Sequence, residues 1–103
     1  MCQKEIFDTV LSIVCRETDL STQQILSENH CNEYSDARTI LTSILYVTIG
    51  MNSVQIAALS GFSASGVLYL MNRLDDRCRN SFLFQSTYRR TLECVRSEIL
   101  SGA

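Results

Sequence analysis

Residues 53–74, SVQIAALSGFSASGVLYLMNRL, decide the fold that we predict for this chain. The stretch indicates a short apolar helix, a break and a second apolar helix. Gly61 lies four residues after the small Ala57 and six before the branched Val67. That spacing lets two helices cross steeply over a tight turn. We therefore predict a helix-turn-helix, and the alternative is an ordinary corner between two helices that binds no ligand.

Polar residues stand where both helices of this pair need caps. Ser63 can accept a hydrogen bond from the free backbone N–H groups of the second helix. Asn52 can do the same for the first helix, and Gln55 occupies the reciprocal position of a capping box. We expect the two helices over about 53–59 and 64–75.

Helical periodicity continues through the rest of the chain, which has no proline. No stretch shows the two-residue alternation of a strand, so we predict an all-α fold of five or six helices. Residues 75–81 either continue the second helix of the pair or break it, and Phe82 and Leu83 could tuck into the core before the last helix. The expected helices cover about 3–16, 22–28, 33–49, 53–59, 64–75 and 84–100.

Length and composition suit a globular protein. The 103 residues, 46% of them hydrophobic and 19% charged, are expected to form a single domain over 1–103. The chain contains no run of about 18 apolar residues, so we predict no membrane span. The N-terminal residues carry early charge and no apolar stretch of the signal-peptide type, so we expect a cytoplasmic protein.

Charge is distributed unevenly. The net charge is −2, but residues 1–52 hold three basic and seven acidic side chains, whereas residues 53–103 hold six basic and four acidic ones. The half that contains the predicted helix-turn-helix is therefore the positive half. Because its field is weak, any DNA affinity should be modest and sensitive to salt.

Neither a metal centre nor a catalytic site is predicted. The five cysteines are an odd number without a C-x-x-C pair, and they are best explained as reduced, small apolar residues. The one histidine, His30, adjoins Cys31 in a polar loop, where two neighbours rarely reach the geometry of a Cys–His nucleophile. We expect no enzymatic activity, no cofactor, no bound metal and no small-molecule substrate.

One stretch carries a family resemblance. Residues 20–27, LSTQQILS, are followed at an ungapped distance by Glu33 and by the pair Ala37-Arg38. With these residues, the chain from Ile6 to about residue 74 resembles the C-terminal DNA-binding domain of the bacterial replication initiator DnaA. That domain belongs to the Trp-repressor-like group of helix-turn-helix folds. The resemblance implies the fold and a bacterial, DNA-binding accessory protein of replication or transcription.

The chain departs from the family where the family reads DNA. The family's basic loop before the long helix is here residues 28–32, ENHCN, which contain no lysine or arginine. The family's Asp-His-Ser-Thr-Val at the recognition helix is here residues 63–67, SASGV, where only Ser65 and Val67 match. The resemblance therefore implies the fold but not recognition of the initiator's own DNA box.

The predicted DNA contacts come from two groups of residues. The start of the second helix should face the major groove, and nearby arginines should bind phosphates. Tyr69 could instead be a half-buried core aromatic. Arg38 could be a surface arginine or one paired with Asp36 or Glu33. The candidate DNA-binding residues are Arg38, Ser63, Ala64, Ser65, Tyr69, Arg73 and Arg77.

The function predicted from the sequence is double-stranded DNA binding through the helix-turn-helix. The alternative is a protein-interaction module that keeps the fold but has lost DNA recognition. Partners other than DNA would then be another protein or a second copy of this chain. The predicted helix over 84–100 could form a dimer face or could close the core of a monomer.

Overall fold

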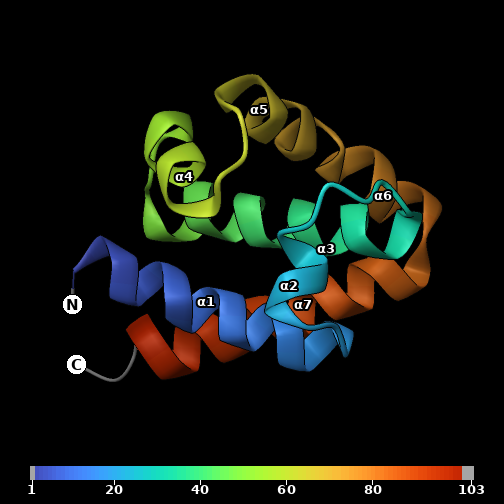
Figure 1. Ribbon diagram of the computed structural model, residues 1–103. Coiled ribbons are helices and arrows are strands. Elements are labelled where there is room, and N and C mark those ends of the chain that lie inside the picture. The colour runs from blue at the N-terminus through green and yellow to red at the C-terminus, as the bar shows by residue number, and fades with distance from the viewer. Residues whose placement is uncertain (1, 101–103) are drawn as a thin grey trace.

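The computed structural model describes residues 2–100, and every regular element in this range is a helix (Figure 1). The predicted all-α class is confirmed. Two π-helical segments extend the α-helices before them. The elements are α1 (Gln3–Thr18), α2 (Thr22–Ile25), α3 (Asn32–Ser43), η1 (Ile44–Ile49), α4 (Ser53–Ser60), α5 (Ala64–Asn72), α6 (Leu74–Asn80), α7 (Phe82–Val95) and η2 (Arg96–Leu100).

The helix bounds lie within two residues of the predicted ones except at the ends of α2 and α5. Because η1 continues α3 and η2 continues α7, residues 2–100 hold six helices longer than one turn, together with the single turn of α2. The helix predicted over 22–28 ends at Ile25. The second helix of the pair ends at Asn72, and the charged segment after it forms a separate helix, α6.

The predicted caps are present. Asn52 and Gln55 form a reciprocal capping box, with 2.8 Å from Gln55 N to Asn52 Oδ1 and 3.0 Å from Asn52 N to Gln55 Oε1. Ser63 Oγ accepts a hydrogen bond from the backbone N–H of Gly66 at 3.0 Å and so caps α5. Each bond satisfies a backbone donor that the first turn of a helix leaves free, which explains where α4 and α5 begin.

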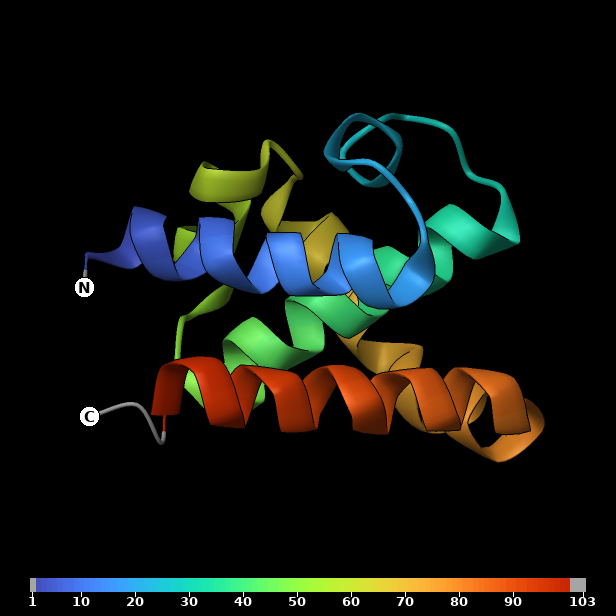
Figure 2. The same cartoon turned by 90° about the horizontal axis from the view of Figure 1, so that it is seen from below.

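The helices stack in layers around α3. Figure 1 shows α4, α5 and α6 above α3, with α1 and α7 below it, and Figure 2 shows α1 and α7 running side by side. Side chains from α1, α3, η1, α4, α5 and α7 meet in one buried cluster. The largest fully buried apolar side chains are Ile13, Ile25, Ile40, Leu41, Ile44, Leu45 and Ile56.

The expectation that Phe82 and Leu83 tuck into the core is wrong. Their side chains are 82% and 74% exposed. Helix α7 already begins at Phe82, and Ser81 Oγ caps it by accepting a hydrogen bond from the N–H of Phe84 at 3.1 Å. Because Phe84 faces the core and successive helical residues turn by about 100°, its two predecessors point away from the core.

Candidate functional site

Helices α4 and α5 meet steeply over a short turn. The helix Ser53–Ser60 and the helical stretch Ala64–Asn80 are bent by 110° relative to each other. Gly61 ends α4 with a positive φ of 84°, a conformation that a side chain would strain. The backbone N–H of Phe62 donates to Ser60 Oγ at 3.1 Å, which fixes the turn. The angle lies in the range that helix-turn-helix pairs occupy.

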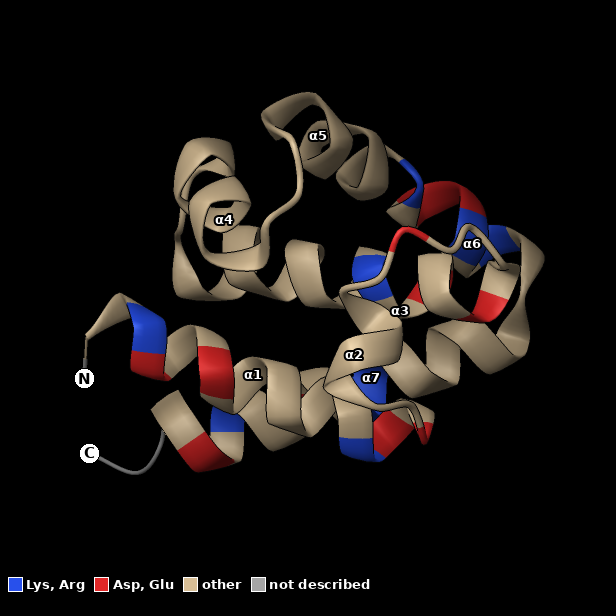
Figure 3. Cartoon of the chain, viewed as in Figure 1, with Lys and Arg blue, Asp and Glu red and all other residues tan. Residues whose placement is uncertain are grey.

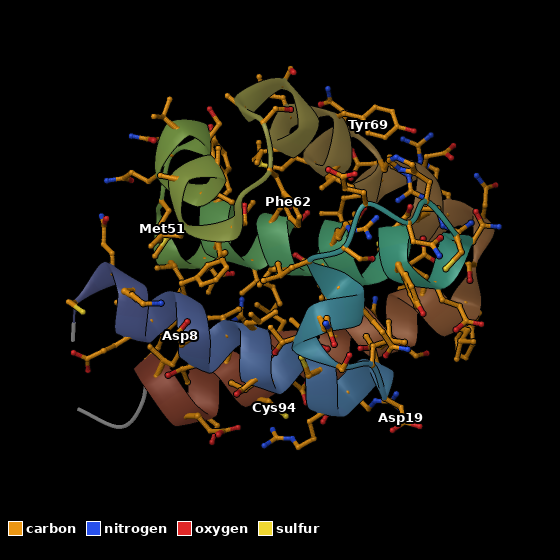
Figure 4. The ribbon with its side chains drawn as sticks, viewed as in Figure 1. Asp8, Asp19, Met51, Phe62, Tyr69 and Cys94 are labelled. Atoms are coloured by element: carbon orange, nitrogen blue, oxygen red, sulfur yellow. The ribbon has the colours of Figure 1, made fainter. Side chains whose placement is uncertain are left out.

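Helix α5 separates into a buried face and an exposed face. Val67 and Leu70 pack inward, and the exposed residues are Ala64, Ser65, Leu68, Tyr69 and Asn72. Tyr69 is 65% exposed, so it is not the half-buried core aromatic of the alternative interpretation, and Figure 4 shows its ring projecting from the helix. Four of the seven predicted site residues therefore share the start and outer face of α5. They are Ser63, Ala64, Ser65 and Tyr69.

Arg38 lies elsewhere than the sequence predicts. Its side chain is buried beneath the α2–α3 connection, where Nε donates to the carbonyl oxygen of Ile25 at 2.6 Å. Its Nη2 donates to the carbonyl oxygen of Ser27 at 2.6 Å and to Ser27 Oγ at 3.2 Å. Burial lowers the pKa of Arg38. In this position the guanidinium supports the end of α2 and is withdrawn from the outer face of α5.

Arg73 and Arg77 share one carboxylate instead of forming an open basic patch. Arg77 Nε and Nη2 donate to the two oxygens of Asp36, each at 2.9 Å, and Arg73 Nη2 lies 3.3 Å from Asp36 Oδ1. Arg73 Nη1 also donates to Thr39 Oγ1 at 3.0 Å. The hydrogen bonds that Arg77 donates to the Asp36 carboxylate raise the pKa of Arg77. These arginines thus join α6 and the preceding kink to α3, and sequence reasoning did not foresee this bond set.

No charged residue occurs between Arg38 and Arg73. The 34 residues 39–72 include η1, α4 and α5, and we call them the neutral end. Figure 3 shows neither basic nor acidic colour on α4 and α5. The neutral end also exposes large apolar side chains on η1, α4 and α5. These are Tyr46, Val47, Val54, Leu68 and Tyr69.

A pocket of about 560 Å³ lies between the α2–α3 connection and the start of α5. It is lined from one side by residues between 26 and 38 and from the other by residues between 60 and 70. Arg38, Ser63 and Tyr69 all border it, so the structure does bring three of the predicted residues to one place. The pocket has no signature in the sequence because its walls come from segments far apart in the chain.

The described residues show no metal centre. Within 2–100 there is no group of three or more His, Cys, Asp or Glu side chains placed to hold a metal ion. All five cysteines are free thiols, and His30 lies exposed beside Cys31.

Comparison with family models, with curated proteins and with solved structures gave no match. Among residues 2–100, no single helix is long and apolar enough to cross a membrane. The bent pair Ser53–Ser60 and Ala64–Asn80 reaches that length and composition only when both helices are taken together.

Proposed function

We propose that this protein is a protein-interaction module that docks an apolar surface of a partner protein on the outer face of α5. The observation that carries the proposal is the uncharged neutral end, which exposes Leu68 and Tyr69 on that face. Interface cores in proteins are depleted of charge and enriched in aromatic side chains. The serines at the start of α5 supply a polar rim to this apolar centre.

The positions of the arginines favour a protein partner over DNA. Affinity for duplex DNA comes largely from lysine and arginine side chains that neutralise phosphates. Arg38 is buried, and Arg73 and Arg77 are held by Asp36. The loop that faces α5 across the pocket contributes Glu28, which would repel a phosphate backbone.

Double-stranded DNA binding is the second candidate, and the 110° angle between the helices favours it. The resemblance to the initiator's C-terminal domain supports it as well. In this case Ser63, Ala64, Ser65 and Tyr69 would enter the major groove. Arg73 and Arg77 would have to leave Asp36 to reach the phosphates. The protein would then serve as an accessory factor in replication or transcription.

A photo-crosslinking residue at position 68 separates the two candidates in cells that make this protein. We expect a discrete crosslinked band that protease removes and nuclease leaves intact. The same residue at position 76, which is exposed on α6, is the matched control and should give no such band. A nuclease-sensitive product at 68, or equal products at both positions, would contradict the proposal. A band at twice the chain mass would identify a second copy as the partner.

Fluorescence anisotropy with random duplex DNA provides the complementary measurement. We expect no saturable binding at low salt. If DNA is the ligand, the logarithm of the affinity should instead fall with the logarithm of salt concentration, with a slope of about −0.9 for each phosphate neutralised. Arg73→Ala would then weaken binding, and that result would move the assignment to the second candidate.

A further inference from the structure

The pocket beside α5 borders a buried cation that has no counter-ion in the described part of the chain. Arg38 is 5% exposed, yet none of the ion pairs among residues 2–100 includes it. Its partners are two carbonyl oxygens and one hydroxyl. Buried charges in proteins are normally paired, because moving an isolated charge out of water is costly. Arg38 is therefore a buried cation without an anionic partner among the described residues.

One nitrogen of Arg38 remains available to such an anion. Nε and Nη2 are engaged with Ile25 and Ser27, whereas Nη1 donates to no atom of the described residues. Among the described residues, Ser43 Oγ is the one side-chain N or O atom that is both fully buried and without a hydrogen-bond partner. Nη1 of Arg38 also has no partner among these residues, so it must retain some contact with solvent. Arg38 lines the 560 Å³ pocket, so a ligand in the pocket lies beside the Arg38 side chain.

The rest of the pocket suits a small molecule with an anionic group and an apolar body. Ser35 and Tyr69 are among the lining residues, and their hydroxyl groups can donate hydrogen bonds to oxygen atoms. Apolar walls come from Leu26 and Phe62. The volume lies within the range of about 300 to 1,000 Å³ that small-molecule sites occupy. His30 and Glu28 also line the pocket, and the negative charge of Glu28 opposes the binding of an anion, which Arg38 must outweigh.

We propose that this pocket binds a small organic oxyanion, a phosphate monoester or a carboxylate, whose anionic group pairs with Nη1 of Arg38. The apolar body of the ligand then lies against Leu26 and Phe62. Arg38 is recessed, so a compact ligand reaches it, whereas the backbone of a DNA duplex stays outside. The pocket shares Tyr69 with the outer face of α5, but the site does not depend on the protein-interaction proposal, because the group that pairs with the anion is Arg38.

Side-chain nitrogen NMR on the intact wild-type protein tests the site directly. The Nε–H of Arg38 donates to Ile25 at 2.6 Å, and the Nε–H of Arg77 donates to Asp36 at 2.9 Å, so both protons are protected from exchange. Phenyl phosphate and benzoate are the probes, and phenol and sodium chloride are their controls. We expect a saturable shift of the Arg38 signal while the Arg77 signal stays in place.

The outcomes separate the two anions from non-specific effects. Phenyl phosphate or benzoate should bind at least about tenfold more tightly than phenol. The probe that binds more tightly, phenyl phosphate or benzoate, shows whether the site prefers a phosphate or a carboxylate. Equal shifts with sodium chloride at matched ionic strength, or equal affinity for phenol, would overturn the proposal.

Two substitutions check that binding occurs in this pocket. Ser35→Ala removes a lining hydroxyl and should weaken binding several-fold, whereas Ser65→Ala, on the outer face of α5, should not change it. Arg38→Met should abolish binding. If Arg38→Met does not fold, the titration of the wild-type protein and the comparison of Ser35→Ala with Ser65→Ala still test the site. Unchanged affinity in Ser35→Ala together with an unmoved Arg38 signal would refute the site.

Discussion

The neutral end and the remainder of the molecule share one core but differ completely in how their surfaces are composed. Residues 39–72 carry no charge, whereas the flanking helices pair their charges with each other. Lys4 contacts Asp8 along α1 at 3.5 Å, and Arg16 of α1 contacts Glu98 of η2 at 2.9 Å. Charges outside the neutral end therefore serve contacts between and along helices, while η1, α4 and α5 are held by apolar burial and by uncharged helix caps.

The border between these regions lies at Arg73, where α5 ends and α6 begins. Arg73 and Arg77 reach back to Asp36 on α3, and all three side chains are less than one third exposed. Exposed pairs such as Lys4–Asp8 contribute about 0 to 1 kcal/mol. Breaking a partly buried cluster costs more than breaking an exposed pair, because removal of one partner leaves charge without compensation. The comparison can thus be tested by substitutions on either side of this border.

The largest effect should come from the core of the neutral end. Ile56 of α4 is fully buried, and Ile56→Ala should lower the free energy of unfolding by about 2–5 kcal/mol, since it removes buried apolar volume and leaves a cavity. Urea denaturation followed by circular dichroism measures the change. Val54→Ala on the same helix is the matched control, because Val54 is 67% exposed. Similar losses in both variants would show that α4 is not packed as described.

At the border, Asp36→Asn should be the next largest change. The substitution leaves Arg73 and Arg77 without their carboxylate and should lower the free energy of unfolding by about 1–3 kcal/mol. The same variant frees two cations and should therefore raise non-specific affinity for duplex DNA at low salt. Asp8→Asn, which loses one exposed pair, should cost less than about 1 kcal/mol. A stability loss no greater in Asp36→Asn than in Asp8→Asn would argue against the cluster.

Sequence patterns predicted the features made by neighbouring residues in both regions, but not the contacts between residues far apart in the chain. The capping box of α4 and the cap at the exposed start of α5 follow from residues within three or four positions of each other, so pattern reasoning reaches them. Arg38 was expected at the surface, as arginine usually is. Its burial depends on carbonyl oxygens 11 and 13 residues earlier, which become available only because α2 ends at Ile25.

The bond set of Asp36 illustrates the same limit. Its partners lie 37 and 41 residues along the chain, and no local pattern connects them. The kink at Arg73 contains neither glycine nor proline, so periodicity could not place the end of α5. The pocket beside Arg38 is also built from distant segments. Prediction therefore succeeds for helices and caps and fails for buried polar contacts between helices.

A smaller effect is expected at the cap that begins α5. Ser63→Ala removes the acceptor for the N–H of Gly66 and should lower the free energy of unfolding by about 1 kcal/mol. Ser65→Ala removes an exposed hydroxyl that lies 3.4 Å from Ser63 Oγ but accepts no hydrogen bond from a free helix N–H, and it should alter stability by less than about 0.5 kcal/mol. Urea denaturation of both variants gives the comparison. A larger loss in Ser65→Ala would mean that the cap does not define this helix.

The smallest expected effect lies on α7, away from the neutral end, and it depends on pH. Burial raises the pKa of Tyr88, whose ring stacks on Phe84 with centroids 6.5 Å apart. Above about pH 9 the unfolded chain loses the tyrosine proton before the folded protein does, so the folded state binds more protons and stability falls as pH rises.

Tyr88→Phe keeps the stacked ring and removes the titrating group, and its stability should decline less steeply than that of the wild type between pH 8 and about pH 10.5. The decline should not vanish, because burial also raises the pKa of the Cys78 thiol. Urea midpoints at the two pH values measure the difference. Tyr69→Phe is the matched control, since Tyr69 is 65% exposed, and it should follow the wild type. A steeper decline in Tyr88→Phe would reverse the sign of this linkage and place the hydroxyl in a setting that favours its ionised form.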